Sequence, residues 1–352
     1  MDDNPLWLQE ESELGYGIQP PVGPGTNIYG VPLSPEQQRF SSQVIDPERL
    51  RTAMEIALST GPGILAGPKA LEAPLQALQT AKYFVKRGVD PQKVWNQLGW
   101  GNKFADEAWR FEIPDQPARV RGAPVDIQPG TKMSEVLAHP ELYRNYPELG
   151  NLLYGGSPPW AGVQGGFDPS TNTIFADKSL SPLTFKRTLL HELQHAVQRK
   201  EGFAVGGTPD LFKTPKWLSD VRKSESVLNQ WRPSVAGKLR DMGYEHGDLT
   251  EAINNASEEA RQKLFSDPLI SEFIGKLLVH QDLLNRPIER YRALAGEQEA
   301  RLAEKRSYMT PEELRRVPPW VMFKTPVEQQ TVIKAGQTFN LEPVEHNPFE
   351  EP

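Results

Sequence analysis

The sequence contains no cysteine among its 352 residues. This absence excludes disulfide bonds, zinc sites built from thiolates and a thiol nucleophile. Any zinc site in this chain must therefore be built from histidine and carboxylate ligands. Histidine is scarce as well, because only six are present, so two that stand close together in the sequence carry information.

Long apolar runs are also absent. No uninterrupted stretch approaches the roughly 20 residues that a membrane-spanning helix needs, and the acidic start Met1–Pro5 lacks the charge pattern of a secretory signal. We therefore expect no membrane span and no signal peptide. The net charge of -7 gives no general reason to expect a nucleic-acid partner, and the 33 prolines indicate many irregular connections.

Two histidines stand four residues apart in the pentapeptide 191–195, which is His-Glu-Leu-Gln-His. The surrounding stretch 183–200 predicts one helix. Its ends carry the expected capping residues, which are Ser181, Pro182 and Gly202. At about 100° per residue, His191 and His195 project from one face. Apolar side chains gather on the opposite face: Leu189, Leu193, Ala196 and Val197.

This pattern favours a metal site. Two imidazoles one turn apart bind a single zinc ion, and Glu192 is positioned to take a proton from the attacking water. The competing interpretation is that each histidine is an ordinary core or surface residue. Chance alone gives the pattern about 0.01 times in a chain of this composition. We therefore predict that His191 and His195 bind metal and that Glu192 is the catalytic base.

A hydrolytic zinc site needs a third protein ligand. The predicted helix 288–306 offers Glu297, whose small neighbours allow another helix to approach closely: Ala293, Gly296 and Ala300. A glycine inside a helix costs about 1 kcal/mol relative to alanine, which also indicates close approach. Glu299 projects about 200° away from Glu297, so the two cannot both reach one ion. Spacing alone leaves open a solvated surface of glutamate and arginine.

Taken in order, the chain predicts an α+β protein that is mostly helical, with a small sheet beside the motif helix and extended Pro/Gly-rich termini. Strands are expected at 109–113 and 173–176, with 119–126 pairing with the first. The strand 173–176 directly precedes the motif helix, and we expect its exposed edge to pair with an extended peptide. The expected segments are an arm over 1–43, helices over 44–98, the catalytic domain over 99–309 and a Pro-rich tail over 310–352.

Helices are expected where capping residues and apolar spacing agree. Before the motif they cover residues 46–59, 68–87, 91–98, 133–139 and 140–146, and after it residues 210–248 and 250–308. The last stretch is expected to be interrupted at Asp267-Pro268 and at Arg286-Pro287. Loops are expected over Gly155–Gly166 and Glu201–Pro209.

Two helical stretches have a second interpretation. Residues 53–81 are rich in alanine and leucine, so a membrane-active amphipathic element competes with packed helices. Residues 210–245 hold Trp217 and Trp231 among lysine and arginine, so a nucleic-acid patch competes with connecting helices. In both cases ordinary helix packing is favoured.

Several stretches together carry a family resemblance. They are Gly99-Trp100, Trp109–Asp115, His139–Tyr143, Tyr146–Leu149, Leu189–Gln198, Glu201–Ala204, Gly206-Gly207 and Ala295–Arg301. Over roughly residues 80–320 the sequence resembles the zincin-like metallopeptidase domain of large polyvalent proteins from phages and conjugative elements. The number and order of these stretches make the resemblance more specific than the HExxH pattern alone.

The resemblance implies a zincin-like fold, a zinc cofactor and peptide-bond hydrolysis by a protein carried on a mobile element. It makes Glu297, in the family's Gly-Glu-x-Glu-Ala-Arg motif, the third zinc ligand beside His191 and His195. One departure precedes the Trp-Arg-Phe-Glu run, where the usual Gly-x-Asp-Gly-Lys is replaced by Asn102–Glu107. That loop carries none of the predicted ligands.

The first hypothesis is therefore a zinc-dependent metallopeptidase in which Glu192 activates a water held by Zn2+. The candidates for the oxyanion donor are Tyr291, His246 and Arg301, and Arg301 is also a candidate for orienting a carboxylate ligand. The alternative is a structural virion protein, such as a tail or ejection component, that uses a zincin-like fold as a scaffold with or without activity.

The two hypotheses share most of their expected partners. These are a peptide or protein substrate and, through the N-terminal arm, other virion proteins, whereas nucleic acid is not expected. The expected location is the virion, the host cytoplasm or both. Neither the substrate nor the oligomeric state follows from the sequence.

Overall fold

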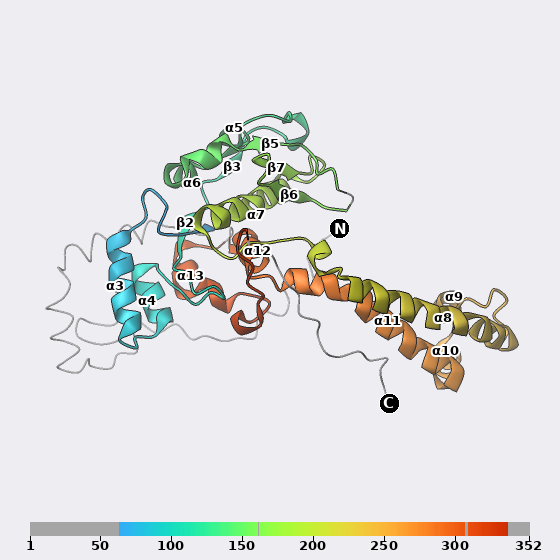
Figure 1. Ribbon diagram of the computed structural model, residues 1–352. Helices are drawn as coiled ribbons and strands as arrows, with labels where there is room; N and C mark the ends of the chain where they lie inside the picture. The colour runs from blue at the N-terminus through green and yellow to red at the C-terminus, as the bar shows by residue number, and fades with distance from the viewer. Residues whose placement is uncertain (1–62, 161, 307–308, 337–352) are drawn as a thin grey trace. The chain divides into compact units, whose positions relative to one another are not determined.

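Two helices that are far apart in the sequence pack together at the centre of the fold. The computed structural model describes residues 63–160, 162–306 and 309–336. In it, α7 (Pro182–Glu201), which holds the predicted metal motif, packs along α12 (Ala295–Arg306) (Figure 1). The described residues are mostly helical with small sheets, so the predicted α+β class is confirmed.

The motif helix α7 forms as the sequence predicts. The Ser181 hydroxyl accepts a hydrogen bond from the backbone N–H of Thr184, and Pro182 occupies the first turn. Gly202 ends the helix with φ at 80°, a left-handed conformation that a glycine adopts without steric cost. Leu189 and Leu193 are fully buried, so the apolar face of the helix packs into the core.

The first sheet has two antiparallel strands, β1 (Gly63–Ala66) and β2 (Phe111–Pro114). The strand predicted over 109–113 is confirmed by β2. The sequence pattern misses β1, because four consecutive apolar residues fit a buried strand and a buried helix equally well. All four residues of β1 are buried, so this strand belongs to the core.

A second sheet pairs β3 (Arg119–Val120) with β4 (Leu137–Ala138). The prediction that residues 119–126 pair with β2 is therefore wrong. The backbone of β3 bonds to β4 instead, and the chain then turns into the short helix η2 (Pro124–Asp126).

The third sheet packs beside α7 and has the strand order β5–β7–β6. Its centre is β7 (Thr173–Ala176), parallel to β5 (Leu153–Tyr154) and antiparallel to β6 (Gly165–Asp168). The position of β7 is as predicted, but its expected exposed edge is wrong because strands pair with both of its edges. The edge strands are β5 and β6, and β6 begins at Gly165, inside the stretch where glycine content predicts a loop.

Short helices precede α7: α3 (Leu75–Lys86), α4 (Pro91–Leu98), α5 (Met133–Val136), α6 (Pro140–Asn145) and η3 (Pro147–Asn151). Of these, α4 and α6 agree with the predicted ranges. The predicted start of α3 at residue 68 is wrong because the chain first forms β1 and a turn. The predicted arm over 1–43 and helix over 46–59 lie outside the described residues.

Part of the stretch 53–81 can be assessed. Its described portion enters α3, whose Ala77, Leu78 and Ala81 are buried within the protein. This burial favours the packed-helix interpretation over a membrane-active element. In the described part of the chain, no helix is both long and apolar enough to cross a membrane.

After α7, the short helix η4 (Pro209–Phe212) leads into α8 (Pro215–Asp241), which pairs with α11 (Pro268–Arg292) (Figure 1). The pair is antiparallel, because the Trp217 indole N–H donates to the Leu283 carbonyl at 2.7 Å near one end of α8, whereas two shorter helices connect the other ends.

These connecting helices are α9 (Leu249–Asn255) and α10 (Glu258–Ser266). Buried residues such as Leu239 and Leu264 give this region its own apolar core. The break predicted at Asp267-Pro268 is confirmed. The break predicted at Pro287 is wrong, because that proline lies inside α11.

The residues that follow α12 return to the body of the fold. They form α13 (Pro311–Arg316), η5 (Pro319–Val321) and η6 (Val327–Gln329). Beyond them, the carbonyl of Ile333 accepts a hydrogen bond from the N–H of Val205 at 2.8 Å. Residues 337–352 of the expected tail lie outside the described residues.

Gln194, in the middle of the motif, ties β1 to α7. Its Oε1 accepts a hydrogen bond from the N–H of Leu65 at 2.8 Å, and its Nε2 donates to the Leu65 carbonyl at 3.1 Å. Both residues are buried. The amide thus satisfies both backbone groups of Leu65, as a neighbouring strand would.

We predict that Gln194→Ala lowers the free energy of unfolding of the metal-free protein by roughly 1–3 kcal/mol, because it leaves buried backbone groups without partners. Chemical denaturation measures the change. The control is Gln76→Ala, the same substitution at an exposed position of α3, which should leave the stability within about 0.5 kcal/mol. Equal effects of the two substitutions would contradict this role of Gln194.

Candidate metal centre

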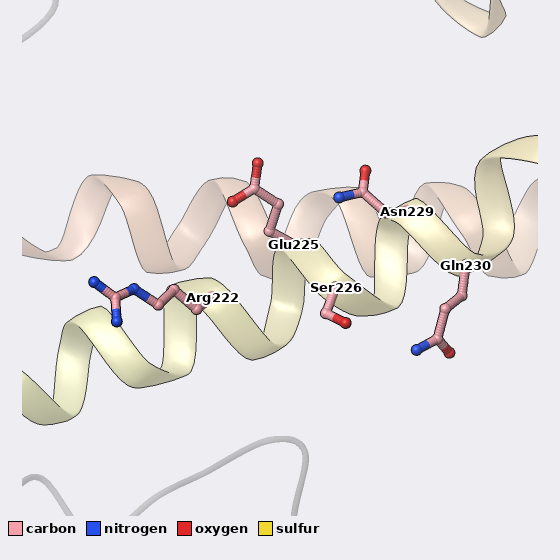
Figure 2. A pocket seen from close by; sticks show the side chains of 5 residues that line it. All are labelled: Arg222, Glu225, Ser226, Asn229 and Gln230. Atoms are coloured by element: carbon pink, nitrogen blue, oxygen red, sulfur yellow. The ribbon is translucent and has the colours of Figure 1, made fainter.

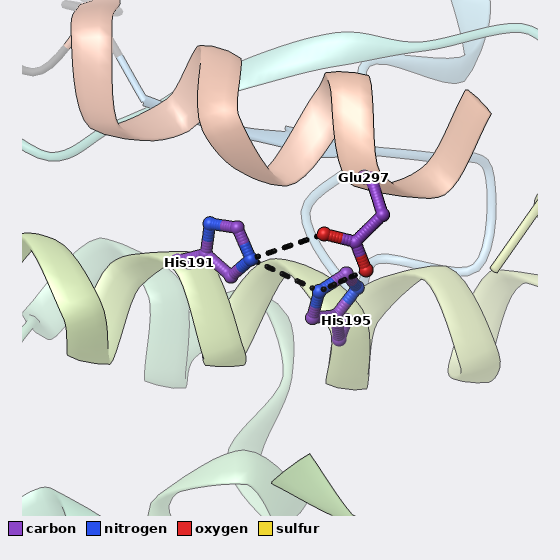
Figure 3. A group of neighbouring side chains, drawn as sticks. All are labelled: His191, His195 and Glu297. Atoms are coloured by element: carbon purple, nitrogen blue, oxygen red, sulfur yellow. Dashed lines mark hydrogen bonds and ion pairs between the residues drawn. The ribbon is translucent and has the colours of Figure 1, made fainter. Parts of the chain in front are cut away.

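Two side chains of α7 and one of α12 converge on a single point (Figure 3). The Nε2 atoms of His191 and His195 lie 3.2 Å apart. Glu297 places Oε1 3.4 Å from Nε2 of His195 and Oε2 3.7 Å from Nε2 of His191. The structure therefore brings together the three residues that the sequence predicts as ligands.

These distances fit a metal ion bound between the three side chains. With zinc–ligand bonds of about 2.0–2.1 Å and tetrahedral angles, neighbouring ligand atoms lie about 3.3–3.4 Å apart. Oε2 of Glu297 is buried and has no hydrogen-bond partner among the described residues, which is costly for a carboxylate oxygen. A bound cation would satisfy that oxygen. The buried cluster can therefore hold a metal ion.

Two glycines permit the close approach. A Cβ on Gly296 would lie 2.2 Å from the carbonyl carbon of Val205, and a Cβ on Gly206 would lie 2.2 Å from Oε1 of Glu297. The predicted close approach at Gly296 is confirmed. However, α12 begins at Ala295, so Gly296 lies in its first turn and the predicted continuous helix 288–306 is wrong.

Hydrogen bonds fix the start of α12 in this position. The Gln198 amide donates to the Gly296 carbonyl at 2.8 Å, and the N–H of Gly207 donates to Oε1 of Glu297 at 3.2 Å. The N–H of Ala295 donates to the Thr331 carbonyl at 2.9 Å. The carboxylate is thus positioned by α7, by the loop after it and by the C-terminal segment.

The charges of the cluster are strongly coupled. Burial alone would lower the pKa of His191, but the Glu297 and Glu304 carboxylates outweigh it and raise the pKa to about 10. Burial would raise the pKa of Glu297, but the two histidines outweigh it and lower the pKa to about 2. Burial lowers the pKa of His195. The metal-free cluster therefore holds one proton, on His191, beside the Glu297 carboxylate.

Glu192 lies against the edge strand of the third sheet. A Cβ on Gly165 of β6 would lie 2.8 Å from its Oε1 and 2.3 Å from the Thr188 methyl group, so a larger residue there would have to displace one of these side chains. Burial, with smaller contributions from Glu297 and Glu304, raises the pKa of Glu192 to about 7. A carboxyl group with such a pKa can accept and release a proton near neutral pH.

The three oxyanion candidates have different positions. Burial and the charge of Glu297 raise the pKa of Tyr291, which remains a neutral hydroxyl beside the cluster. The positive charge of Arg301 acts on His195, and its guanidinium carbon lies 5.7 Å from the Tyr291 ring centre. The structure does not bring His246 to the site. It is exposed beyond the C-terminal end of α8, a helix about 40 Å long, so this candidate is wrong.

Glu299, on another side of α12, has a structural partner. It lies 2.7 Å from the guanidinium of Arg110, which also bonds to Asp106 at 2.8 Å and 2.9 Å. The rings of Phe104 and Phe203 pack against the same guanidinium. Both Arg110 and Glu299 are buried. The alternative of a solvated glutamate and arginine surface is therefore wrong for this part of the helix.

Three residues that position the motif helix or the cluster are not predicted from the sequence. Gln194 and Gln198 lie on α7, and Glu304 lies on α12. The one available signal is spacing, because Glu304 follows Glu297 by seven residues, which is about two helical turns. The contacts of the two glutamines with backbone groups 98 and 129 residues away leave no trace in the local pattern.

A pocket of about 420 Å³ lies away from this cluster, on α8 (Figure 2). Five polar residues of that one helix line it: Arg222, Glu225, Ser226, Asn229 and Gln230. With one positive and one negative side chain it does not concentrate positive charge, as a nucleic-acid site requires. It gives no support to the nucleic-acid alternative.

Metal binding to this cluster should depend on pH. Zinc binds neutral imidazole, whereas His191 is protonated in the metal-free protein because its pKa is about 10. Zinc binding near neutral pH should therefore release about one proton, and the affinity should rise about tenfold per pH unit until the pH nears 10. Calorimetry in buffers of different ionisation enthalpy measures the release. An affinity that stays constant from about pH 7 to pH 9 would contradict the assignment.

Gly206→Ala should weaken zinc binding at least tenfold, because the new methyl group would overlap Glu297 and His195. The matched control is Gly275→Ala on α11, where an added Cβ meets nothing within 4 Å. This control should bind zinc as the wild type does. Competition with a chelating dye measures both affinities, and unchanged binding by the Gly206 variant would show that the close approach of α12 is not needed.

Part of the chain is similar to a known protein family. The family described as Large polyvalent protein associated domain 23 matches residues 63–121, which include β1 and β2. The match supports the link to large polyvalent proteins and does not extend to the motif helix. Neither the curated proteins nor the solved structures contain a match to this chain.

Proposed function

We propose that this chain is a zinc-dependent metallopeptidase with a zincin-like domain. The observation that carries the proposal is the convergence of His191, His195 and Glu297 on one point, with Glu192 beside them. Hydrolytic zinc sites combine three protein ligands of this kind with one open position. Because the chain has no cysteine, its ligands suit a catalytic zinc better than a closed thiolate site.

The chemistry divides between the ion and the protein. A bound zinc would polarise the scissile carbonyl and lower the pKa of a water molecule. Glu192 accepts the proton of the attacking water and transfers it to the leaving amine. Tyr291 supplies a neutral hydroxyl donor and Arg301 a positive charge, either of which would stabilise the developing oxyanion.

We further propose that the substrate is an extended peptide paired with β6. No described strand pairs with the second edge of β6, and Gly165 on this strand lies against Glu192. An edge strand binds a peptide backbone through main-chain hydrogen bonds. Pairing there would bring a backbone carbonyl close to the base.

The biological setting is also a proposal. The match to the polyvalent-protein family supports a protein carried by a phage or conjugative element. Action in the virion or the host cytoplasm, with virion proteins as further partners, is consistent with such an origin. A structural virion component, the alternative, would require the fold but would not require a buried carboxylate base beside the metal cluster.

The test is Glu192→Gln in the full chain, assayed with a library of quenched fluorescent peptides. We expect the loss of general-base catalysis to reduce hydrolysis about 10²–10⁴-fold, while zinc content measured by elemental analysis stays at one ion per chain. His195→Ala should lose both zinc and activity.

Two results would overturn the proposal. Protein purified without chelator that contains no zinc, and takes up none, would remove the metal centre. Zinc-loaded wild-type protein that cleaves no library peptide, or cleaves peptides as fast as the Glu192 variant does, would favour the structural alternative.

A further inference from the structure

The Nδ1 atoms of the two histidines face away from the proposed metal position, and each has a side-chain partner. Nδ1 of His191 lies 2.5 Å from Oε1 of Glu304. Nδ1 of His195 lies 2.9 Å from Oε1 of Gln198. Both Nε2 atoms are thereby turned toward Glu297, as Figure 3 shows.

The partner at Nδ1 determines the protonation of each ring. A carboxylate oxygen can only accept a hydrogen bond, so Nδ1 of His191 must carry a proton when it contacts Glu304. In the neutral ring, the lone pair then lies on Nε2, which is the nitrogen that faces Glu297. For His195, the Gln198 amide donates to the Gly296 carbonyl, which leaves its Oε1 to accept from Nδ1.

The two partners differ in charge and surroundings. Gln198 is neutral and fully buried between α7 and α12. Glu304 is anionic, and its side chain is 36% exposed. A carboxylate at Nδ1 makes the imidazole a stronger donor to a metal than an amide does. The two histidines are therefore oriented alike but are not equivalent as ligands.

The spacing on α12 explains how one helix supplies both acidic groups. Seven residues are about two turns, so Glu297 and Glu304 project from the same face. The helix runs antiparallel to α7, because Gly296 contacts Gln198 whereas Glu304 contacts His191. Glu297 therefore meets the cluster between the rings, while Glu304 reaches the far side of the first ring.

We propose that Glu304 is a positioning residue for the metal ligand His191: it holds the ring in the Nδ1-protonated form and strengthens Nε2 as an electron-pair donor to the metal. Gln198, which has no charge, orients the His195 ring in the same way. The inference rests on the proposed zinc centre. It adds a seven-residue pair on α12, in which the first glutamate binds the ion and the second orients a histidine.

The test compares Glu304→Gln and Glu304→Ala for zinc binding by the folded full chain, well below its melting temperature. Glutamine can still accept a hydrogen bond but has no charge, whereas alanine can do neither. We expect the affinity to fall about tenfold for glutamine and up to about 100-fold for alanine. The charge-matched control is Glu289→Gln on the exposed surface of α11, which should bind zinc as the wild type does.

A second readout distinguishes positioning from a stabilising surface ion pair. Nitrogen NMR of zinc-loaded protein with labelled histidine should show both rings with a proton on Nδ1, and the His191 signal should shift in both Glu304 variants. A surface pair would alter the melting temperature but neither the affinity nor this signal.

The outcomes separate the two proposals. Wild-type protein that binds zinc, together with Glu304 variants whose affinity stays within twofold of it, would overturn the positioning role and leave the metallopeptidase proposal intact. Wild-type protein that binds no zinc would overturn both.

Discussion

The site depends on how closely α12 approaches α7 and the loop that follows it. Gly296 and Gly206 leave no space for even a methyl group at the two points of contact. Protein interiors are close-packed, so an added methyl group at either point would displace neighbouring atoms along the whole contact. The 3–4 Å separations between the imidazole nitrogens and the Glu297 oxygens are a consequence of this contact, because no residue of the cluster is adjacent in sequence to its partner on the other helix.

Buried ion pairs hold α12 in its position. Arg110 bonds to Asp106 and Glu299 with all of its surface removed from solvent. A buried ion pair adds little stability compared with apolar packing, but losing one member costs several kcal/mol. The pair therefore restricts which arrangements of the helix are tolerated. Asp106 belongs to the loop 102–107, so this loop supports α12 although it supplies no residue of the metal cluster.

The sequence predicts the parts of the site that lie within one element. The motif helix has caps, spacing and an apolar face that all indicate the same structure. Glu297 is accessible to prediction through its small neighbours and the family resemblance. The strands β1 and β6 cannot be predicted in this way, because four residues show too little periodicity and the strands that pair with them come from other segments of the chain. The local sequence also fails at Pro287, where a proline predicts a helix break but α11 continues across it with Pro287 buried.

The hydrogen bonds between Gln194 and Leu65 limit where recombination could divide this chain without loss of folding. The segment that matches the polyvalent-protein family supplies both β1 and Arg110, and each is completed by a group outside the segment. Inheriting residues 63–121 without α7 and α12 would leave the Arg110 guanidinium with Asp106 but without Glu299, and would leave the backbone groups of Leu65 without the Gln194 amide. Recombination junctions that preserve folding should therefore fall outside this whole assembly, so that the three pieces are exchanged as one unit.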